Sequence, residues 1–159
     1  MSGPWRHADL GIVDRSRLLR FSFDGQPYTG FAGDTLASAL LGAGLRLVGR
    51  SFKYHRPRGI VAAGAEEPNA LVRLGRGRLA EPNTQATRVE LEPDLVAQSQ
   101  HCWPSLGFDL GAAIGLLKPF MPAGFYYKTF IGQRAWHLVE PFIRRAAGFG
   151  HIPEWPDPE

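Results

Sequence analysis

The feature that most constrains the fold of this chain is an Asp24-Gly25 pair between two strand-like segments. Residues 17–23 alternate loosely between apolar and polar side chains, and residues 26–31 follow as a second extended segment. Such alternation is typical of a half-buried strand. A tight hairpin turn needs positive φ angles, which glycine accepts without steric cost. The sequence therefore predicts an antiparallel hairpin early in the chain.

A short helix is predicted directly after this hairpin. Asp34 or Thr35 can cap the free backbone N–H groups of its first turn, and Gly42 and Gly44 can end it. The apolar stripe between these ends is formed by Leu36, Ala37, Leu40 and Leu41. A hairpin, a helix, a long loop and further strands follow one another in this order in a β-grasp domain. We therefore expect an α+β fold of that kind.

The segments that follow the helix are shorter and less regular. Further strands are expected over residues 70–74, 79–80 and 88–91. The middle one is weak because Pro82 interrupts it, and proline cannot donate to a strand ladder. The β-rich part is therefore expected to end near residue 93.

Beyond that point the chain becomes rich in aromatic residues, glycine and proline. Helices are expected over residues 110–117 and 134–147, the second kinked at Pro141. The predicted organisation is a flexible lead over 1–16, a ferredoxin-like β-grasp domain over 17–93, an aromatic-rich and irregular helical extension over 94–150, and a proline-rich linker over 151–159.

Composition narrows the class of protein. The only cysteine, Cys102, cannot form an intrachain disulfide or a multi-cysteine metal site. No apolar run approaches the roughly 20 residues of a membrane-spanning helix, and the first residues lack the apolar core of a signal peptide. We therefore expect a cytoplasmic protein that does not contact a membrane.

The loop over residues 59–72 resembles the segment that holds a 2Fe–2S cluster in plant-type ferredoxins. Cysteines recur there with four and then two residues between them, because one loop places three thiolates around one cluster. The same slots here hold Ala62, Glu67 and Ala70. None of them supplies a soft thiolate ligand. We therefore expect the fold to be kept without a bound metal.

Several stretches of the chain, taken in order, resemble the N-terminal region of the α subunit of heterotetrameric sarcosine oxidase. They are residues 31–41, 50–59, 67–72, 81–84, 103–106 and 122–130. The small cluster-binding subunits of related amine, opine and hydrogen cyanide-forming dehydrogenases are similar, but carry cysteines at the positions of Ala62, Glu67 and Ala70 and a fourth near Thr87. All four are absent here. Their absence favours the sarcosine oxidase branch.

This resemblance implies a β-grasp domain in a longer α subunit that also carries an NAD-binding and a folate-binding domain. The whole enzyme is expected to demethylate sarcosine oxidatively to glycine, with tetrahydrofolate as one-carbon acceptor and O2 as oxidant. FAD, FMN and NAD are expected in the full complex and no cofactor in this chain, which has no Gly-x-Gly-x-x-Gly fingerprint.

The expected role is therefore a non-redox structural and assembly module without catalytic residues of its own. Its expected partners are other oxidase subunits or the following domains of the same α subunit. Two alternatives stay open. One is a small accessory subunit of an amine dehydrogenase complex, and the other is a 2Fe–2S electron-transfer protein of an amine or opine dehydrogenase complex. The second alternative needs cysteines that the sequence does not have.

The net charge is only +3, but residues 35–65 contain no acidic side chain. The cations of this stretch are candidates for contact with a partner or with a flavin or dinucleotide phosphate, since arginine presents a planar fork of donors. The simpler hypothesis is that they bond loop carbonyls or an acidic partner surface. One basic loop is too small a footprint for nucleic acid. The candidates are Arg50, Lys53, Arg56 and Arg58.

Other residues of chemical interest favour structural roles. Of the acidic pair Glu66 and Glu67, we expect Glu67 to bond loop N–H groups or a basic neighbour rather than to act as an acid or base. Cys102 is expected to be an unreactive thiol, either packed or at the surface. The aromatic cluster over 120–130 is expected to form a packed or subunit-facing surface. No metal-ligand spacing relates the histidines at 7, 55, 101, 137 and 151.

Overall fold

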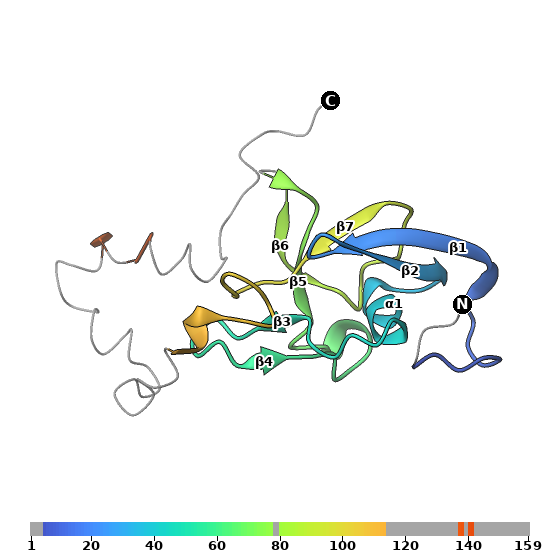
Figure 1. Ribbon diagram of the computed structural model, residues 1–159, viewed down its shortest axis with the longest axis horizontal. Coiled ribbons are helices and arrows are strands. Elements are labelled where there is room, and N and C mark those ends of the chain that lie inside the picture. The colour runs from blue at the N-terminus through green and yellow to red at the C-terminus, as the bar shows by residue number, and fades with distance from the viewer. Residues whose placement is uncertain (1–4, 78–79, 114–136, 139, 142–159) are drawn as a thin grey trace.

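The computed structural model describes residues 5–77, 80–113, 137–138 and 140–141 (Figure 1). Its main elements are β1 (Asp14–Phe23), β2 (Gln26–Ala32), α1 (Leu36–Gly42), β5 (Leu71–Leu74), β6 (Glu81–Gln85) and β7 (Leu95–Gln98). The five strands form one sheet in the order β2-β1-β7-β5-β6. β1 and β7 run parallel, whereas the other neighbours are antiparallel. This mixed sheet with one helix confirms the expected α+β, β-grasp class.

The predicted hairpin is present, with Phe23 opposite Gln26. Both turn residues have positive φ angles, 50° at Asp24 and 78° at Gly25, as a tight two-residue connection requires. β1 begins at Asp14, however, so the predicted strand over 17–23 starts too late and the flexible lead cannot extend to residue 16. The pairing of the first residues of β1 with β2 is hard to predict from the sequence, because the register of the two strands shifts between Asp14 and Leu18.

Helix α1 begins and ends as the sequence predicts. Thr35 is its N-cap, and Thr35 and Ser38 satisfy each other's backbone N–H groups in a capping box. At the other end, the N–H of Leu45 donates to the carbonyl of Leu40, and Gly44 has a φ of 90°. This is a glycine-terminated Schellman arrangement. The helix is therefore fixed at both ends by local sequence.

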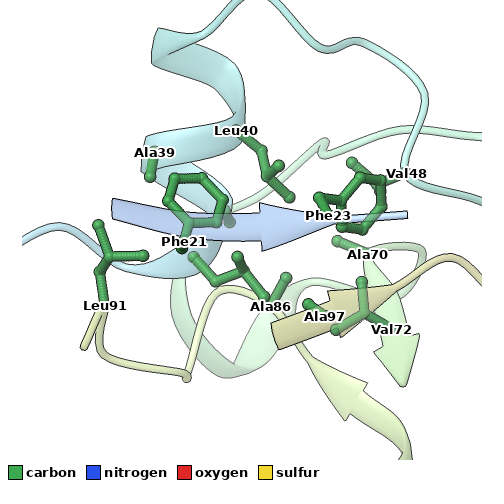
Figure 2. Packing of buried hydrophobic residues seen from close by; sticks show 12 residues of the cluster. Phe21, Phe23, Ala39, Leu40, Val48, Ala70, Val72, Ala86, Leu91 and Ala97 are labelled. Carbon is green, nitrogen blue, oxygen red and sulfur yellow. The ribbon is translucent and has the colours of Figure 1, made fainter. Parts of the chain in front are cut away.

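The hydrophobic core lies between α1 and the sheet (Figure 2). Phe21 and Phe23 point into it from alternate positions of β1 and are 3% and 2% exposed. Leu36 and Leu40 close it from the helix, four residues apart on one face. Fully burying a side chain of this size contributes roughly 1.5–3 kcal/mol relative to exposure. Burial of Leu36 and Leu40 therefore contributes several kcal/mol to the packing of α1 on the sheet, at roughly 1.5–3 kcal/mol for each side chain.

The return strands differ from their predictions. The return strand expected from 79–80 is observed from Glu81 as β6, which includes Pro82, while residue 79 lies outside the described residues. The strand expected over 88–91 is wrong, and β7 lies further on. Pro82 is tolerated because β6 is an edge strand of the sheet. The predicted limit of the β-rich part at residue 93 is therefore too early, since β7 lies between β1 and β5.

Residues 88–91 do not form a strand because their backbone serves α1 instead. The carbonyl of Val89 accepts from the N–H of Leu36, and the N–H of Leu91 donates to the carbonyl of Asp34. Helix N-termini leave such N–H groups without partners inside the helix. The backbone of this segment is therefore used to hold the start of α1.

Most of the predicted C-terminal extension lies outside the described residues, including the aromatic cluster over 120–130 and the linker over 151–159. Residues 110–113 form a 3-10 turn, and the described residues from 137 to 141 are helical. In the described part of the chain, no helix has both the length and the apolar character needed to cross a membrane.

Replacing Gly30 by alanine should destabilise the fold. A Cβ there would lie 2.5 Å from Leu91 Cδ2 and 2.9 Å from Ala39 Cβ, where β2 approaches α1. Overpacking of this kind costs about 1–3 kcal/mol. The matched control is Gly107→Ala, whose Cβ would meet no atom within 4 Å. Urea unfolding monitored by circular dichroism checks both variants, and equal midpoints would contradict the described packing of β2 on α1.

Candidate functional site

The loop at the predicted cluster position is organised around one carboxylate. It runs from β4 (Pro57–Arg58) through the short 3-10 helix η1 (Gly64–Glu66) to β5. Glu67 is 0% exposed. Its Oε2 accepts the N–H groups of Val61 and Ala62, each at 2.6 Å, and its Oε1 accepts those of Asn69 and Ala70 at 2.7 and 3.1 Å. The expectation that Glu67 bonds loop N–H groups is therefore confirmed.

These contacts also determine the charge state of Glu67. Burial by itself would raise the pKa of its carboxyl, because it penalises the ionised form. The four backbone N–H groups, led by that of Ala62, more than offset burial and hold the pKa below its ordinary value. Glu67 is therefore ionised at neutral pH and acts as an internal anion for the loop.

A second layer of side chains holds the same loop from β6 and the turn after it. Thr87 Oγ1 donates to the carbonyl of Gly64 at 2.6 Å. Gln85 Nε2 donates to the carbonyls of Glu67 and Ala65 at 2.9 and 3.2 Å. Thr87 is the residue at the fourth expected cysteine position, and it lies against this loop as the resemblance implies.

The basic candidates divide into internal and surface residues. They lie on the hairpin of β3 (Gly49–Arg50) and β4. Arg50 donates to the carbonyls of Leu106 and His55, and Arg58 donates to the side chain of Asn69. Both guanidinium groups are therefore bonded within the described part of the fold. Lys53 and Arg56 instead lie at the hairpin tip against the ring of Tyr54.

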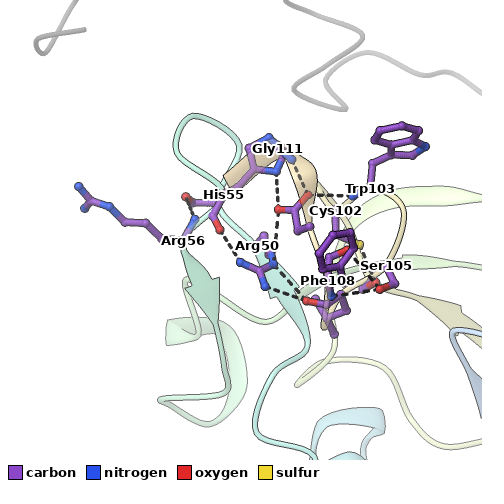
Figure 3. Close-up of polar contacts among 12 residues, drawn as sticks. Arg50, His55, Arg56, Cys102, Trp103, Ser105, Phe108 and Gly111 are labelled. Atoms are coloured by element: carbon purple, nitrogen blue, oxygen red, sulfur yellow. Dashed lines mark hydrogen bonds and ion pairs between the residues drawn. The ribbon is translucent and has the colours of Figure 1, made fainter. Parts of the chain in front are cut away.

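Asp109 is a buried centre that the sequence did not indicate (Figure 3). Its side chain is 0% exposed, and its Oδ1 accepts the N–H groups of Trp103 and Gly111 at 2.9 and 3.0 Å. Its Oδ2 lies 2.8 Å from His55 Nδ1 and 3.5 Å from Arg50 Nε. It thereby joins the β3–β4 hairpin to the loop over 101–111.

The pKa of the Asp109 carboxyl is lowered for the same physical reasons as that of Glu67. Burial would raise the pKa of its carboxyl, but the N–H of Trp103 and the bond from His55 lower it below the ordinary value. Because an ionised carboxylate only accepts, His55 donates through Nδ1. No sequence signal could have found Asp109, since it is an isolated acid whose partner His55 is distant in the chain.

Cys102 behaves as expected for an unreactive thiol. It is half-buried and its Sγ lies 3.2 Å from Ser99 Oγ. Burial raises the pKa of this thiol, and the nearby carboxylates of Asp24 and Asp109 raise it further. The thiolate is therefore scarce at neutral pH. Within the described residues, no three His, Cys, Asp or Glu side chains are grouped so as to hold a metal ion.

A family described as a 2Fe-2S iron-sulfur cluster binding domain matches residues 16–102. The chain belongs to this family. It is also 62% identical to the sarcosine oxidase subunit alpha of Rhizobium meliloti, over 98% of this chain and 16% of that subunit. The corresponding subunit of Corynebacterium sp. strain U-96 is 38% identical over 72% of this chain and 11% of its own length. The resemblance to sarcosine oxidase α subunits is thus confirmed, although the chain spans only a small part of these relatives.

Among solved structures, the chain matches the crystal structure of L-proline dehydrogenase from P. horikoshii with a TM-score of 0.44 and 17% identity. The match covers 55% of this chain and 16% of the other. A likeness this weak does not bear on function.

The 2Fe–2S cluster that gives the family its description does not fit the donor set of this chain. Such a cluster is held by four cysteine thiolates. The matching positions offer two methyl groups, at Ala62 and Ala70, the hydroxyl of Thr87 and the carboxylate of Glu67. The carboxylate is already bonded to four backbone N–H groups, and the hydroxyl donates to Gly64. No electron-transfer step is therefore derived for this loop.

Replacing Glu67 by glutamine should destabilise the chain and change its response to acid. The amide keeps one acceptor oxygen and turns an NH2 group towards N–H donors, and each buried donor left unpaired costs about 1–3 kcal/mol. In the parent chain, the lowered pKa of Glu67 contributes stability that is present above the unfolded value near 4.5 and is lost as pH falls through the folded value. The variant should lack that part of the acid transition.

Urea unfolding at pH 7 and at several values below pH 5 measures both effects of Glu67→Gln. The matched control is Glu66→Gln at the neighbouring exposed position, which should leave stability within about 0.5 kcal/mol. Parallel pH profiles for the parent and the Glu67 variant would show that this carboxylate does not anchor the loop.

Restoring the four cysteines should allow some cluster binding. The quadruple variant carries Ala62→Cys, Glu67→Cys, Ala70→Cys and Thr87→Cys, which supplies thiolates and removes the internal carboxylate. After anaerobic reconstitution with iron and sulfide, we expect the visible absorption of a 2Fe–2S cluster. The parent chain, with only Cys102, is the control. A variant that is folded but colourless would show that the loop is aligned wrongly with the cluster-binding relatives.

Proposed function

We propose that this chain is a non-redox structural and assembly module of a sarcosine oxidase α subunit. The observation that carries the proposal is the buried Glu67 carboxylate, which occupies a cluster-ligand position and bonds the backbone of the loop. The loop thus has a built-in anion where relatives are expected to hold a redox centre. The high identity to sarcosine oxidase subunit alpha supports the choice of complex.

In this proposal, the complex demethylates sarcosine oxidatively to glycine, with tetrahydrofolate as one-carbon acceptor and O2 as oxidant. FAD, FMN and NAD are assigned to the full complex. The NAD site lies outside this chain, because the chain lacks the glycine-rich fingerprint that would place a dinucleotide on a helix N-terminus. The contribution of this chain is a rigid domain with surfaces for its partners. The partners are other oxidase subunits or further domains of the same α subunit.

The alternative of an electron-transfer protein is favoured by one observation, the match to a family described as cluster-binding. The residues at the four cluster-ligand positions argue against this alternative. Carboxylate, hydroxyl and methyl groups are poor substitutes for thiolates at an iron–sulfur cluster. The chain shares the sequence pattern of that family over residues 16–102. It does not share the cysteine ligands of a cluster. A clusterless accessory subunit of an amine dehydrogenase complex uses the same frame and differs only in the partner.

The test is to purify the tagged chain, in its natural polypeptide, from its own cells and to measure subunit masses, flavin absorption, iron and acid-labile sulfide. We expect larger subunits and bound flavin, with sarcosine-dependent peroxide formation. Removing this domain should prevent assembly. Stoichiometric iron and sulfide assigned to this chain would favour electron transfer. Normal assembly without the domain would show that it is no assembly module, and activity with another amine would change the substrate.

A further inference from the structure

The segment before β1 is held on the rest of the domain by side chains. Residues 5–13, the N-terminal strap, pass beside α1 before the chain enters β1 (Figure 1). Within the described part of the chain, no backbone-to-backbone hydrogen bond joins the strap to the sheet or to α1. Arg15 Nη2 instead donates to the strap carbonyls of His7 and Leu10 at 2.9 and 2.8 Å. The side chain of Arg6 extends from the strap to the start of α1.

The guanidinium of Arg6 lies in a site formed by a carboxylate, an aromatic ring and a glycine. Its Nη1 and Nη2 donate to Oδ1 and Oδ2 of Asp34 at 3.0 and 2.7 Å, which is the two-point geometry that arginine makes with carboxylates. Its Cζ lies 5.3 Å from the centroid of the Phe31 ring. On the side of α1, a Cβ added at Gly42 would lie 2.7 Å from Nη2. Asp34, Phe31 and Gly42 thus form a cradle for a guanidinium group.

The carboxylate of Asp34 is paired by this guanidinium. The side chain of Asp34 is 0% exposed, and a buried charge is costly unless it is paired and hydrogen-bonded. Two donors come from neighbouring residues of the domain, the N–H of Phe31 at 2.9 Å and Ser38 Oγ at 2.7 Å. Arg6 supplies two more, together with the opposite charge. One guanidinium therefore completes both the hydrogen bonding and the charge pairing of this carboxylate.

The other contacts of the strap lie closer to solvent. Arg46 Cζ lies 4.6 Å from the centroid of the Trp5 ring, but Trp5 is 46% exposed, compared with 12% for the side chain of Arg6. A cation–π contact at an exposed site contributes less than a desolvated one. Leu10 and Ile12 are exposed. Arg6 is therefore the main attachment of the strap to the domain.

A surface pocket makes the cradle accessible to small molecules. Arg6 forms part of the pocket wall, together with Thr29 and Phe31 of β2 and with Gly42 and Ala43 at the end of α1. The volume of the pocket is about 210 Å³, which exceeds that of a small alkylguanidinium ion. A shorter side chain at position 6 would thus open the cradle to an added cation.

We propose that Asp34, Phe31 and Gly42 form a guanidinium-binding site that the chain fills with its own Arg6, which latches the N-terminal strap over the junction of β2 and α1. The ligand class is a monosubstituted guanidinium, because a planar fork of N–H donors meets both carboxylate oxygens at once. The inference goes beyond the proposed function and does not depend on any partner of the domain.

Chemical rescue of Arg6→Ala in the full chain tests the ligand class. The substitution should raise the unfolding equilibrium constant about tenfold or more, measured by urea unfolding, because a buried carboxylate loses its partner. Ethylguanidinium at millimolar concentration should restore part of that stability in a saturable way. Ethylammonium should not, since it lacks two parallel N–H donors. Arg17→Ala, at an exposed position of β1, is the control for the loss of a positive charge.

The parent chain is the second control for the rescue. Its cradle already holds Arg6, so it should gain no stability from either cation. Equal effects of the two cations on Arg6→Ala, or no rescue by either, would overturn the proposed site. Rescue of equal strength in the double variant Arg6→Ala/Gly42→Ala would do the same, because the added Cβ would lie where the guanidinium binds.

Limited proteolysis tests the latch without the need for rescue. Arg6→Met keeps most of the side-chain volume and removes both the charge and the donors. Thermolysin should then cleave beside Leu10 and Ile12 several times faster than in the parent chain, because a released segment opens locally more often. Arg17→Met is the matched control and should be cleaved at the parent rate. An unchanged rate in Arg6→Met, shown to be folded by circular dichroism, would overturn the latch.

Discussion

The structure depends on a single buried carboxylate. An ionised group in a protein interior costs several kcal/mol unless its hydrogen-bonding capacity is met, and Glu67 meets it with four backbone N–H groups. Those donors come from both ends of the loop between β4 and β5. One side chain therefore fixes where the loop closes and where β5 enters the sheet, so that Ala70 and Val72 reach the core.

Asp109 applies the same physical solution at a second irregular segment. Backbone N–H groups outside helices and sheets still need partners when they are buried. Asp109 supplies acceptors for two of them and also binds His55 of the hairpin. These two described loops thus keep a defined shape through internal carboxylates. Loops of defined shape are consistent with the proposed role as an assembly module.

The family match and the residues at the cluster-ligand positions indicate different things about this chain. The frame is that of a 2Fe-2S iron-sulfur cluster binding domain, while the ligand positions carry groups that are already bonded within the fold. We infer that the frame is used as a scaffold, with its electrostatic centre supplied by Glu67.

The sequence alone determined the features with local causes. Asp24-Gly25 predicted the hairpin, and Asp34 or Thr35 with the two glycines predicted the limits of α1. For Glu67, the sequence predicted bonds to loop N–H groups or to a basic neighbour. The position of β7 was decided only by tertiary structure, because its place between β1 and β5 depends on pairing with strands distant in the chain. The same holds for Asp109, whose role depends on residues more than fifty positions away, Arg50 and His55. Local sequence specifies turns and helix caps. Long-range strand pairing and burial decide which isolated acidic residue becomes a buried carboxylate that bonds several neighbours.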